Sequence, residues 1–277
     1  MRGLRRSAAS AAGVEWIDGD LADEPALVRL CAKADVVIHV AGLVKARSRA
    51  AFDAVNVEGS RRLAVAAREA AHVVLVSSLT AREPVLSDYA ASKRAAEEVM
   101  ARTLRGRLSI LRPCAIYGPA DRELLPIFQA AAVSPFLPVF SRSARIAMIH
   151  VEDAAEQIMA LAAARPRPVP TALCDGRPDG YGWGELMTAA ARACGRRITL
   201  APVADGWLHA LATANDLARH LGASPMLTRG KARELLHGDW SVSAAERAME
   251  APRARHTLDT GFRDTVDWYR SAAWMTR

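Results

Sequence analysis

The chain has 277 residues, which is enough for one large α/β domain or two small ones whose core needs no disulfide or metal. Hydrophobic residues make up 51% and charged residues 24%, a composition that excludes disordered, collagen-like and low-complexity chains. The net charge of +7 suggests nucleic-acid binding, but the basic residues are scattered and no basic stretch alternates with aromatic residues. We therefore expect no nucleic-acid partner.

Cysteine usage and the absence of apolar leader sequences point to a reducing compartment. The four cysteines are far apart and form no CxxC pair, so we expect neither a zinc site nor disulfides, and we expect a cytoplasmic protein. The first residues lack the apolar run of a signal peptide. The longest uncharged run, Leu124–Ser141, contains three prolines, so we expect it to pack or line a pocket, and we expect no membrane partner.

The first half of the chain alternates short apolar runs with stretches of helical period. This alternation predicts βαβ units and a doubly wound parallel α/β sheet of the Rossmann type. The predicted strands are Val14–Asp20, Asp35–Gly42, His72–Ser78 and Leu108–Pro113, and the predicted helices are Pro25–Ala34, with Asp23 as N-cap, Ala50–Ala71 and Asp88–Leu104.

The second half of the chain is less regular. A short strand is predicted over Arg145–Val151 and a helix over Glu152–Ala164, followed by helices near Gly182–Cys194, Asp205–Leu221, Thr228–His237 and Asp259–Ala273. We therefore predict a dinucleotide-binding core over residues 1–113. Residues 114–277 would form a smaller, mostly helical substrate-binding region, parts of which return to the core sheet.

Parallel sheets bind ligands beyond the carboxyl ends of their strands, so Asp20, Gly42, Ser78 and Pro113 are expected to face a site. The most informative motif is Tyr89-Ala-Ala-Ser-Lys93, which follows the strand end at Ser78. Residues four apart on a helix share a face, and an ammonium beside a phenol favours the phenolate. Tyr89 is therefore a candidate acid/base at neutral pH, with Ser78 as a hydrogen-bond donor to a substrate oxygen.

Seven segments together resemble the extended short-chain dehydrogenase/reductase family of NAD(P)-dependent epimerases, dehydratases and 4-reductases. They are GDL (19–21), HVAG (39–42), NVEGS (56–60), VSSLT (76–80), YAASK (89–93), LRPCAIYGP (111–119) and IHVEDAA (149–155). The Arg-Pro start of the sixth segment is closest to the 4-reductase-like branch. Ala115 stands where sugar-nucleotide epimerases usually carry Asn, which weakens the case for a nucleotide-sugar substrate.

The resemblance implies catalytic and substrate roles for four residues. Tyr89 would be the acid/base, Lys93 would tune Tyr89 and hold the nicotinamide ribose, and Ser78 would polarise a substrate carbonyl or hydroxyl. Thr80 would contact substrate.

The resemblance also implies cofactor contacts. Tyr89 and Lys93 would contact the nicotinamide half, and the other expected cofactor residues are Arg6, Asp20, Leu21, Ala41, Gly42, Pro113 and Ile116. Asn56 and the pair of His150 and Asp153 are expected to be structural. Arginines without a nearby acid at the end of the first strand favour NADP over NAD, with Arg6 as the ligand of the 2′-phosphate.

One family feature is missing from the sequence. The family opens with a strand, a GxxGxxG turn and a helix that binds the pyrophosphate, and no segment here has that spacing. The segment MRGLRR instead resembles the end of the family's second strand. We therefore expect that Met1 is an internal residue of a protein truncated by roughly 30 residues, a loss that could leave the chain inactive; the coding DNA upstream tests this. The alternative is a diverged or pseudogene product that no longer binds a dinucleotide.

Two functions of different class remain open. The first is an NAD(P)-dependent oxidoreductase, epimerase or dehydratase that transfers hydride at an oxygen-bearing carbon of a small-molecule substrate. The second is a catalytically silent Rossmann-fold binding or scaffold protein, which the absent GxxGxxG turn favours and Ser78, Tyr89 and Lys93 disfavour. Family members commonly form homodimers through helices equivalent to Ala50–Ala71 and Asp88–Leu104, so a homodimer is the expected assembly if the chain associates.

Overall fold

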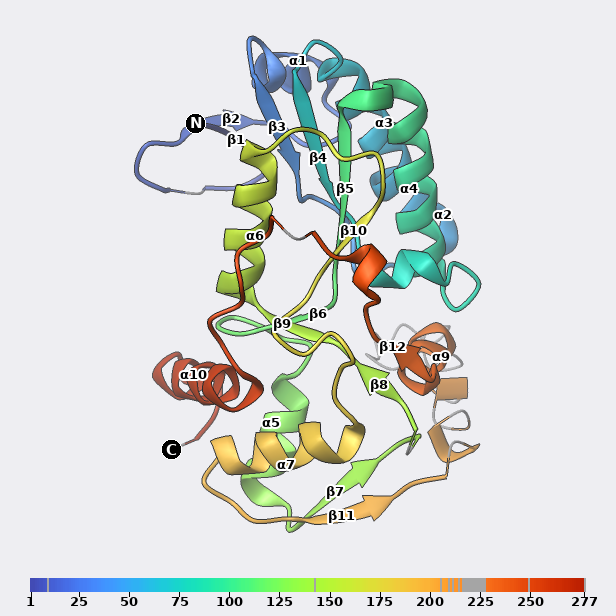
Figure 1. The fold of residues 1–277 in the computed structure, drawn as a ribbon, viewed down its shortest axis with the longest axis vertical. Helices are drawn as coiled ribbons and strands as arrows, with labels where there is room; N and C mark the ends of the chain where they lie inside the picture. The colour runs from blue at the N-terminus through green and yellow to red at the C-terminus, as the bar shows by residue number, and fades with distance from the viewer. Residues whose placement is uncertain are drawn as a thin grey trace. The chain divides into compact units, whose positions relative to one another are not determined.

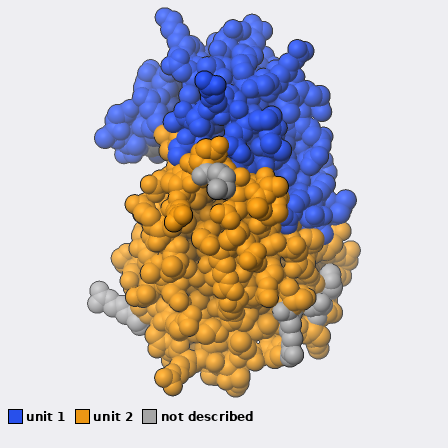
Figure 2. Space-filling model, in the orientation of Figure 1, with its two compact units in different colours: residues 1–112, 160–171 blue, residues 113–159, 172–277 orange. Residues whose placement is uncertain are grey.

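A computed structural model describes residues 1–8, 10–141, 143–204, 206–208, 210, 212–213, 215, 228–248 and 250–276. The chain forms two compact units: residues 1–112 with 160–171, called unit 1, and residues 113–159 with 172–277, called unit 2 (Figure 2). The predicted helix over 205–221 lies largely outside the described residues. No helix in the described part of the chain has the length and apolar character that crossing a membrane requires.

The main sheet contains three of the four predicted parallel strands, and its fourth strand, β10, was not among the predictions. Its four strands lie in the order β10-β5-β4-β3 (Figure 1), and β4 pairs in parallel with both β3 and β5. Every residue of β4 is buried, as the continuous apolar run predicts for a strand covered on both faces. The strands are β3 (Val36–His39), β4 (His72–Val76), β5 (Leu108–Pro113) and β10 (Thr171–Leu173).

Strands β1 (Arg2–Arg5) and β2 (Glu15–Asp18) form a separate parallel pair. Within the described residues no hydrogen-bonded ladder joins this pair to β3. Leu4 of β1 nevertheless packs against the unit 1 core, which includes Val37 of β3 and Leu75 of β4.

The helices of unit 1 match the predictions with one difference. Asp23 accepts a hydrogen bond from the backbone of Ala26 as the N-cap of α1 (Glu24–Cys31), and α4 (Asp88–Leu104) has the predicted bounds. The helix predicted over 50–71 extends from Arg49 to Ala66, and a π-helical turn (Asp53–Val57) interrupts it between α2 (Arg49–Phe52) and α3 (Glu58–Ala66). That turn carries Asn56.

The side chain of Asn56, which lies in the π-helical turn, bonds to residues distant in sequence. Its amide accepts a hydrogen bond from the Leu43 backbone at 2.7 Å and donates to the Leu43 carbonyl at 3.0 Å and to Ser92 Oγ at 2.9 Å. Apolar periodicity does not report such a side-chain bond to a loop, so the interruption was invisible in the sequence pattern. Asn56 supports the loop after β3, as expected for a structural residue.

Unit 2 is built around an aromatic core and short parallel strand pairs. Tyr117, Phe128 and Phe262 pack edge to face, with ring centroids 4.9–5.0 Å apart. Phe128, Ala131 and Leu137 of the uncharged run 124–141 are buried, whereas Val133 and Phe136 of the same run are exposed. The pairs are β6 (Ala115–Tyr117) with β9 (Met148–His150), β7 (Phe136–Val139) with β11 (Thr199–Pro202), and β8 (Arg145–Ile146) with β12 (Asp239–Trp240); the helices are α5 (Leu125–Val133), α6 (Val151–Ala163), α7 (Trp183–Ala193), α9 (Arg229–Leu236) and α10 (Leu258–Ser271).

Gly180 provides a test of how unit 2 is packed. It has φ +73°, and a Cβ there would lie 2.7 Å from the carbonyl carbon of Ile146, whereas Gly13 has φ +74° with nothing within 4 Å. Both Gly→Ala variants carry the cost of a left-handed residue, about 1–2 kcal/mol, but only G180A also meets the backbone of β8. We expect G180A to lower the free energy of unfolding by at least roughly 1 kcal/mol more than G13A in urea denaturation. Equal losses would contradict this packing.

Candidate active site in unit 1

The YxxxK motif lies at the start of α4, next to the carboxyl end of β4. Ser87 caps the helix by accepting a hydrogen bond from the backbone of Ala90 at 3.0 Å. Half-buried Tyr89 lies in the first turn, with its ring 6.1 Å from that of Phe52. Lys93, one turn later, is only 6% exposed, and its Nζ donates to the carbonyl of Val76 at 2.9 Å. Val76 is the last residue of β4, so this bond brings Lys93 to the strand end that leads into Ser78.

Ser78 is oriented by the short turn that follows it. Its Oγ accepts hydrogen bonds from the backbone of Thr80 at 3.2 Å and from the Thr80 hydroxyl at 2.9 Å. Neither bond uses the hydrogen of the Ser78 hydroxyl, which can therefore be donated to a substrate oxygen. Thr80 thus orients Ser78, a role that the sequence analysis did not assign to it.

A buried ion pair supports this site, and the sequence analysis missed it. Glu97, one turn beyond Lys93, accepts hydrogen bonds from Ser77 Oγ at 2.6 Å and from Arg112 Nε and Nη2 at 2.9 and 2.6 Å. It therefore links α4 to both β4 and β5. The available signal was the spacing of Tyr89, Lys93 and Glu97, which puts a third polar residue on one face of an otherwise Ala-rich helix.

Burial changes the titration of two basic groups near the site. Burial lowers the pKa of Lys93 to about 8, and the nearby Glu97 carboxylate partly opposes this shift. Burial, followed by the charge of Lys93, lowers the pKa of His39 at the end of β3 to about 3. His39 is therefore neutral at pH 7, and its Nε2 lies 2.9 Å from Ser60 Oγ.

Four of the predicted cofactor residues are exposed and follow the carboxyl ends of three strands. Arg6 follows β1, Asp20 comes two residues after β2, and Ala41 and Gly42 come directly after the end of β3. The Asp20 carboxylate accepts a hydrogen bond from the Ala22 backbone at 2.7 Å. The structure therefore places these residues at strand ends, as the sequence predicts for a ligand site of a parallel sheet.

The other predicted cofactor residues are distributed differently. Leu21 is half-buried against α3, where a Cβ on Gly59 would lie 2.9 Å from the Leu21 side chain. Pro113 is the last residue of β5, and exposed Ile116 lies in β6. Both belong to unit 2.

These residues fit the two ends of a dinucleotide. The nicotinamide ribose would meet Lys93 and Tyr89, and exposed backbone at Ala41 and Gly42 allows close approach of a ligand. Asp20 and Arg6 offer an acceptor and a cation at the other end, and the described residues show no ion pair for Arg6. The fit does not extend to the pyrophosphate, since the sequence has no GxxGxxG turn to surround it.

His150 and Asp153 make structural contacts within unit 2. The Asp153 carboxylate accepts hydrogen bonds from the backbones of Arg255 and His256 at 3.1 and 3.0 Å, and it lies 3.0 Å from His256 Nδ1. Buried His150 stacks on His256 with ring centroids 3.8 Å apart. Asp153 therefore fixes the segment that leads into α10, in agreement with the structural role expected for it.

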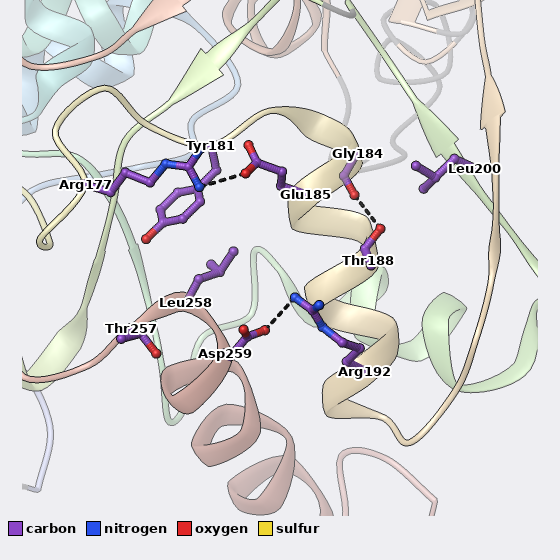
Figure 3. A pocket seen from close by; sticks show the side chains of 10 residues that line it. All are labelled: Arg177, Tyr181, Gly184, Glu185, Thr188, Arg192, Leu200, Thr257, Leu258 and Asp259. Carbon is purple, nitrogen blue, oxygen red and sulfur yellow. Dashed lines mark hydrogen bonds and ion pairs between the residues drawn. The ribbon is translucent and has the colours of Figure 1, made fainter.

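A cavity of about 710 Å³ lies in unit 2 beside α7 and α10 (Figure 3). Two ion pairs occupy its wall, Arg177 with Glu185 at 2.7 Å and Arg192 with Asp259 at 2.8 Å. None of the predicted site residues lines it. Its lining comprises Arg177, Tyr181, Gly184, Glu185, Thr188, Arg192, Leu200, Thr257, Leu258 and Asp259.

Comparison with known proteins identifies the family of this chain. Residues 2–171 match the NAD dependent epimerase/dehydratase family. The chain belongs to this family. The chain is 48% identical over 266 residues to the ceramide reductase of Caulobacter vibrioides (strain NA1000 / CB15N), covering 95% of this chain and 83% of the relative.

Several solved structures share the fold of this chain. The crystal structure of gox2253 has a TM-score of 0.77 at 21% identity, covering 99% of this chain and 91% of that one. The UDP-glucose 4-epimerase of Thermus thermophilus in complex with NAD has a TM-score of 0.70 at 19% identity, covering 98% and 91%. At such identities the likeness extends to the Rossmann-type fold alone. Family and relative together make this chain an NAD(P)-dependent oxidoreductase-type enzyme.

The lowered pKa of Lys93 predicts a pH-dependent stability. Below pH 8 Lys93 carries a proton in both the folded and the unfolded state, so the free-energy cost of burying the ammonium lowers the stability in full. Between pH 8 and 10.5 Lys93 stays protonated only in the unfolded state, and this cost disappears. The free energy of unfolding should rise over this window by roughly 3 kcal/mol through this group. Lys93→Met should lack this contribution, so its stability relative to the wild type should fall as pH rises. Parallel pH profiles of the two proteins in urea denaturation would contradict the assignment.

Proposed function

We propose that the protein is an NADPH-dependent reductase that reduces a ketone on a ceramide-type lipid to a secondary alcohol. One observation carries the substrate class, namely the 48% identity to a ceramide reductase over 95% of the chain. Ceramides bear secondary hydroxyl groups, and the ketone that corresponds to such an alcohol is the group that hydride transfer reduces. The Ser78, Tyr89 and Lys93 arrangement supports the reaction type.

In the proposed reaction, each side chain has a defined task. When bound, the reduced nicotinamide supplies hydride to the carbonyl carbon. The Ser78 hydroxyl donates a hydrogen bond to the carbonyl oxygen and stabilises the negative charge that develops there. The Tyr89 hydroxyl gives its proton to this oxygen, so that the carbonyl becomes an alcohol and the phenol becomes a phenolate.

Lys93 and the groups around it prepare Tyr89 for this transfer. An ammonium one helical turn away favours the phenolate that the transfer produces. Because the Val76 carbonyl and the nearby Glu97 carboxylate both stabilise the charged form of Lys93, they oppose the effect of burial. Bulk solvent then restores the Tyr89 proton after the reaction.

The choice of NADPH rests on Arg6. A guanidinium at the end of β1 can pair with the two oxygens of a 2′-phosphate, which NADH lacks. No acidic residue lies between Met1 and Gly13, so the segment contains none of the carboxylates with which NAD enzymes hold the ribose hydroxyls.

Tyr89→Phe tests the proton transfer. The variant retains the ring but has no proton to give, so we expect the rate of NADPH oxidation with a ketone-bearing ceramide analogue to fall by roughly 10²–10⁴-fold, with the Kd for NADPH nearly unchanged. Tyr117→Phe is the matched control, because that hydroxyl makes a single long hydrogen bond of 3.4 Å in unit 2. Comparable rates for Tyr89→Phe and the wild type would exclude Tyr89 as the acid.

Arg6→Ala tests cofactor choice. Losing a charge-assisted contact to the 2′-phosphate should raise the Kd for NADPH by at least roughly tenfold and leave the Kd for NADH unchanged, as measured by quenching of tryptophan fluorescence. NADH titration of the same variant serves as the internal control. A wild-type preference for NADH, or an unchanged Kd for NADPH in the variant, would overturn the assignment.

The same titrations separate the reductase from the silent scaffold. A scaffold would be stably folded, would bind neither nucleotide, and would give equal thermal unfolding with and without NADPH. A reductase would bind NADPH, and its unfolding temperature would rise with the logarithm of the ligand concentration once that concentration exceeds the Kd.

A further inference from the structure

A surface in unit 2 combines exposed apolar and basic side chains. Its residues are distant in sequence from the proposed catalytic residues. Helix α5 ends at Val133, which is 72% exposed, and β7 begins at Phe136, which is 58% exposed. Pro135 between them is also exposed. Scattered single apolar residues are normal on a protein surface, but here a valine, a proline and a phenylalanine within four positions are all exposed.

Two arginines lie beside this patch through the pairing of β11 with β7. Thr199 stands opposite Phe136 in the parallel ladder, and its backbone donates to the Pro135 carbonyl at 2.8 Å (Figure 1). Arg196 and Arg197 directly precede β11 and are exposed, and no ion pair is formed by either within the described residues.

The start of β11 is fixed by the end of α7. Gly195 has φ +75°, and the backbone of Arg196 donates to the Ala191 carbonyl at 2.9 Å, which closes the helix and turns the chain toward β11. The arginines are therefore held next to the start of β7 by backbone hydrogen bonds at both ends of their short segment.

The two chain segments that contain this patch carry positive charges and no negative ones. Residues 124–141 contain no charged side chain, and residues 193–203 contain only the two arginines. A patch of two unpaired cations beside apolar side chains complements a surface that presents anions above an apolar layer. A bilayer containing anionic phospholipids has this structure.

We propose that this tip, made of Val133, Pro135, Phe136, Arg196 and Arg197, docks the protein on a membrane surface rich in anionic phospholipids. Val133 and Phe136 enter the boundary between headgroups and acyl chains, and the two guanidiniums bind lipid phosphates. The inference rests on the proposed function in one respect, since a ceramide-type substrate resides in a bilayer. It replaces the expectation of no membrane partner, which followed from the lack of a spanning segment and does not address peripheral docking.

Vesicle co-sedimentation without substrate or cofactor tests the docking. The wild type should bind vesicles of phosphatidylcholine mixed with phosphatidylglycerol, with less binding to phosphatidylcholine alone and at high salt. Phe136→Ser should weaken binding by roughly tenfold, and Arg196→Ser and Arg197→Ser by roughly fivefold each. Val85→Ser, which changes an 80% exposed valine of unit 1, and Arg102→Ser on α4 are the matched controls and should bind as the wild type does.

The outcomes distinguish docking from the reductase activity. Equal binding by the tip variants and the controls would overturn the proposal. It would also be overturned if Phe136→Ser changed the apparent mass in gel filtration without changing vesicle binding, because the tip would then join two copies of this chain. Reductase assays in detergent micelles report the activity separately, and the tip variants should be fully active there while losing activity on vesicles. Vesicle binding without activity would refute the proposed function and leave the docking intact.

Discussion

The hydrogen bond from Lys93 Nζ to the Val76 carbonyl couples the two parts of the candidate active site. It joins α4, which carries Tyr89, to the end of β4, which leads into Ser78. A buried ammonium without partners would lose its proton or destabilise the fold. The carbonyl at the end of β4 therefore holds Lys93 in place and also helps keep it charged, and this contact helps to set the relative position of Tyr89 and Ser78.

The ion pair of Glu97 and Arg112 adds a second connection, which joins α4 to β5. Both side chains are almost completely buried, where a lone charge would be costly, but each satisfies the other through two hydrogen bonds. Ser77 Oγ donates to the same carboxylate, so the residue immediately before Ser78 is also tied to α4. Removing one partner of this pair leaves an uncompensated buried charge next to the site. Removing one partner of an exposed ion pair, such as the pair formed by Arg94 and Glu98, affects only a solvent-screened contact.

The sequence predicted those features that depend on periodicity and on local chemistry. The buried strand β4, the bounds of α4 and the Asp23 cap all follow from apolar runs, helical spacing and a side chain that bonds its own backbone. The features it did not predict depend on contacts between distant residues. Arg112 meets Glu97 across 15 positions, and Asn56 reaches Leu43 across 13, so neither the ion pair nor the π-helical turn has a local signature.

The separate β1–β2 pair changes how the two ends of the proposed cofactor site are linked. Arg6 and Asp20 follow strands of this pair, whereas Gly42 and Ser78 follow strands of the main sheet, and no ladder connects the two within the described residues.

Helix α1 links the two sheets instead. Arg2 of β1 donates to the carbonyls of Arg29 and Ala32 at the end of this helix, and Leu27 packs in the core that includes Leu75 of β4. Side-chain packing tolerates small shifts that a ladder of hydrogen bonds does not, so the strand ends that lead to Arg6 and Asp20 are joined to the main sheet less rigidly than the strands of that sheet are joined to one another. The geometry at Tyr89, Lys93 and Ser78 is set within the main sheet and α4.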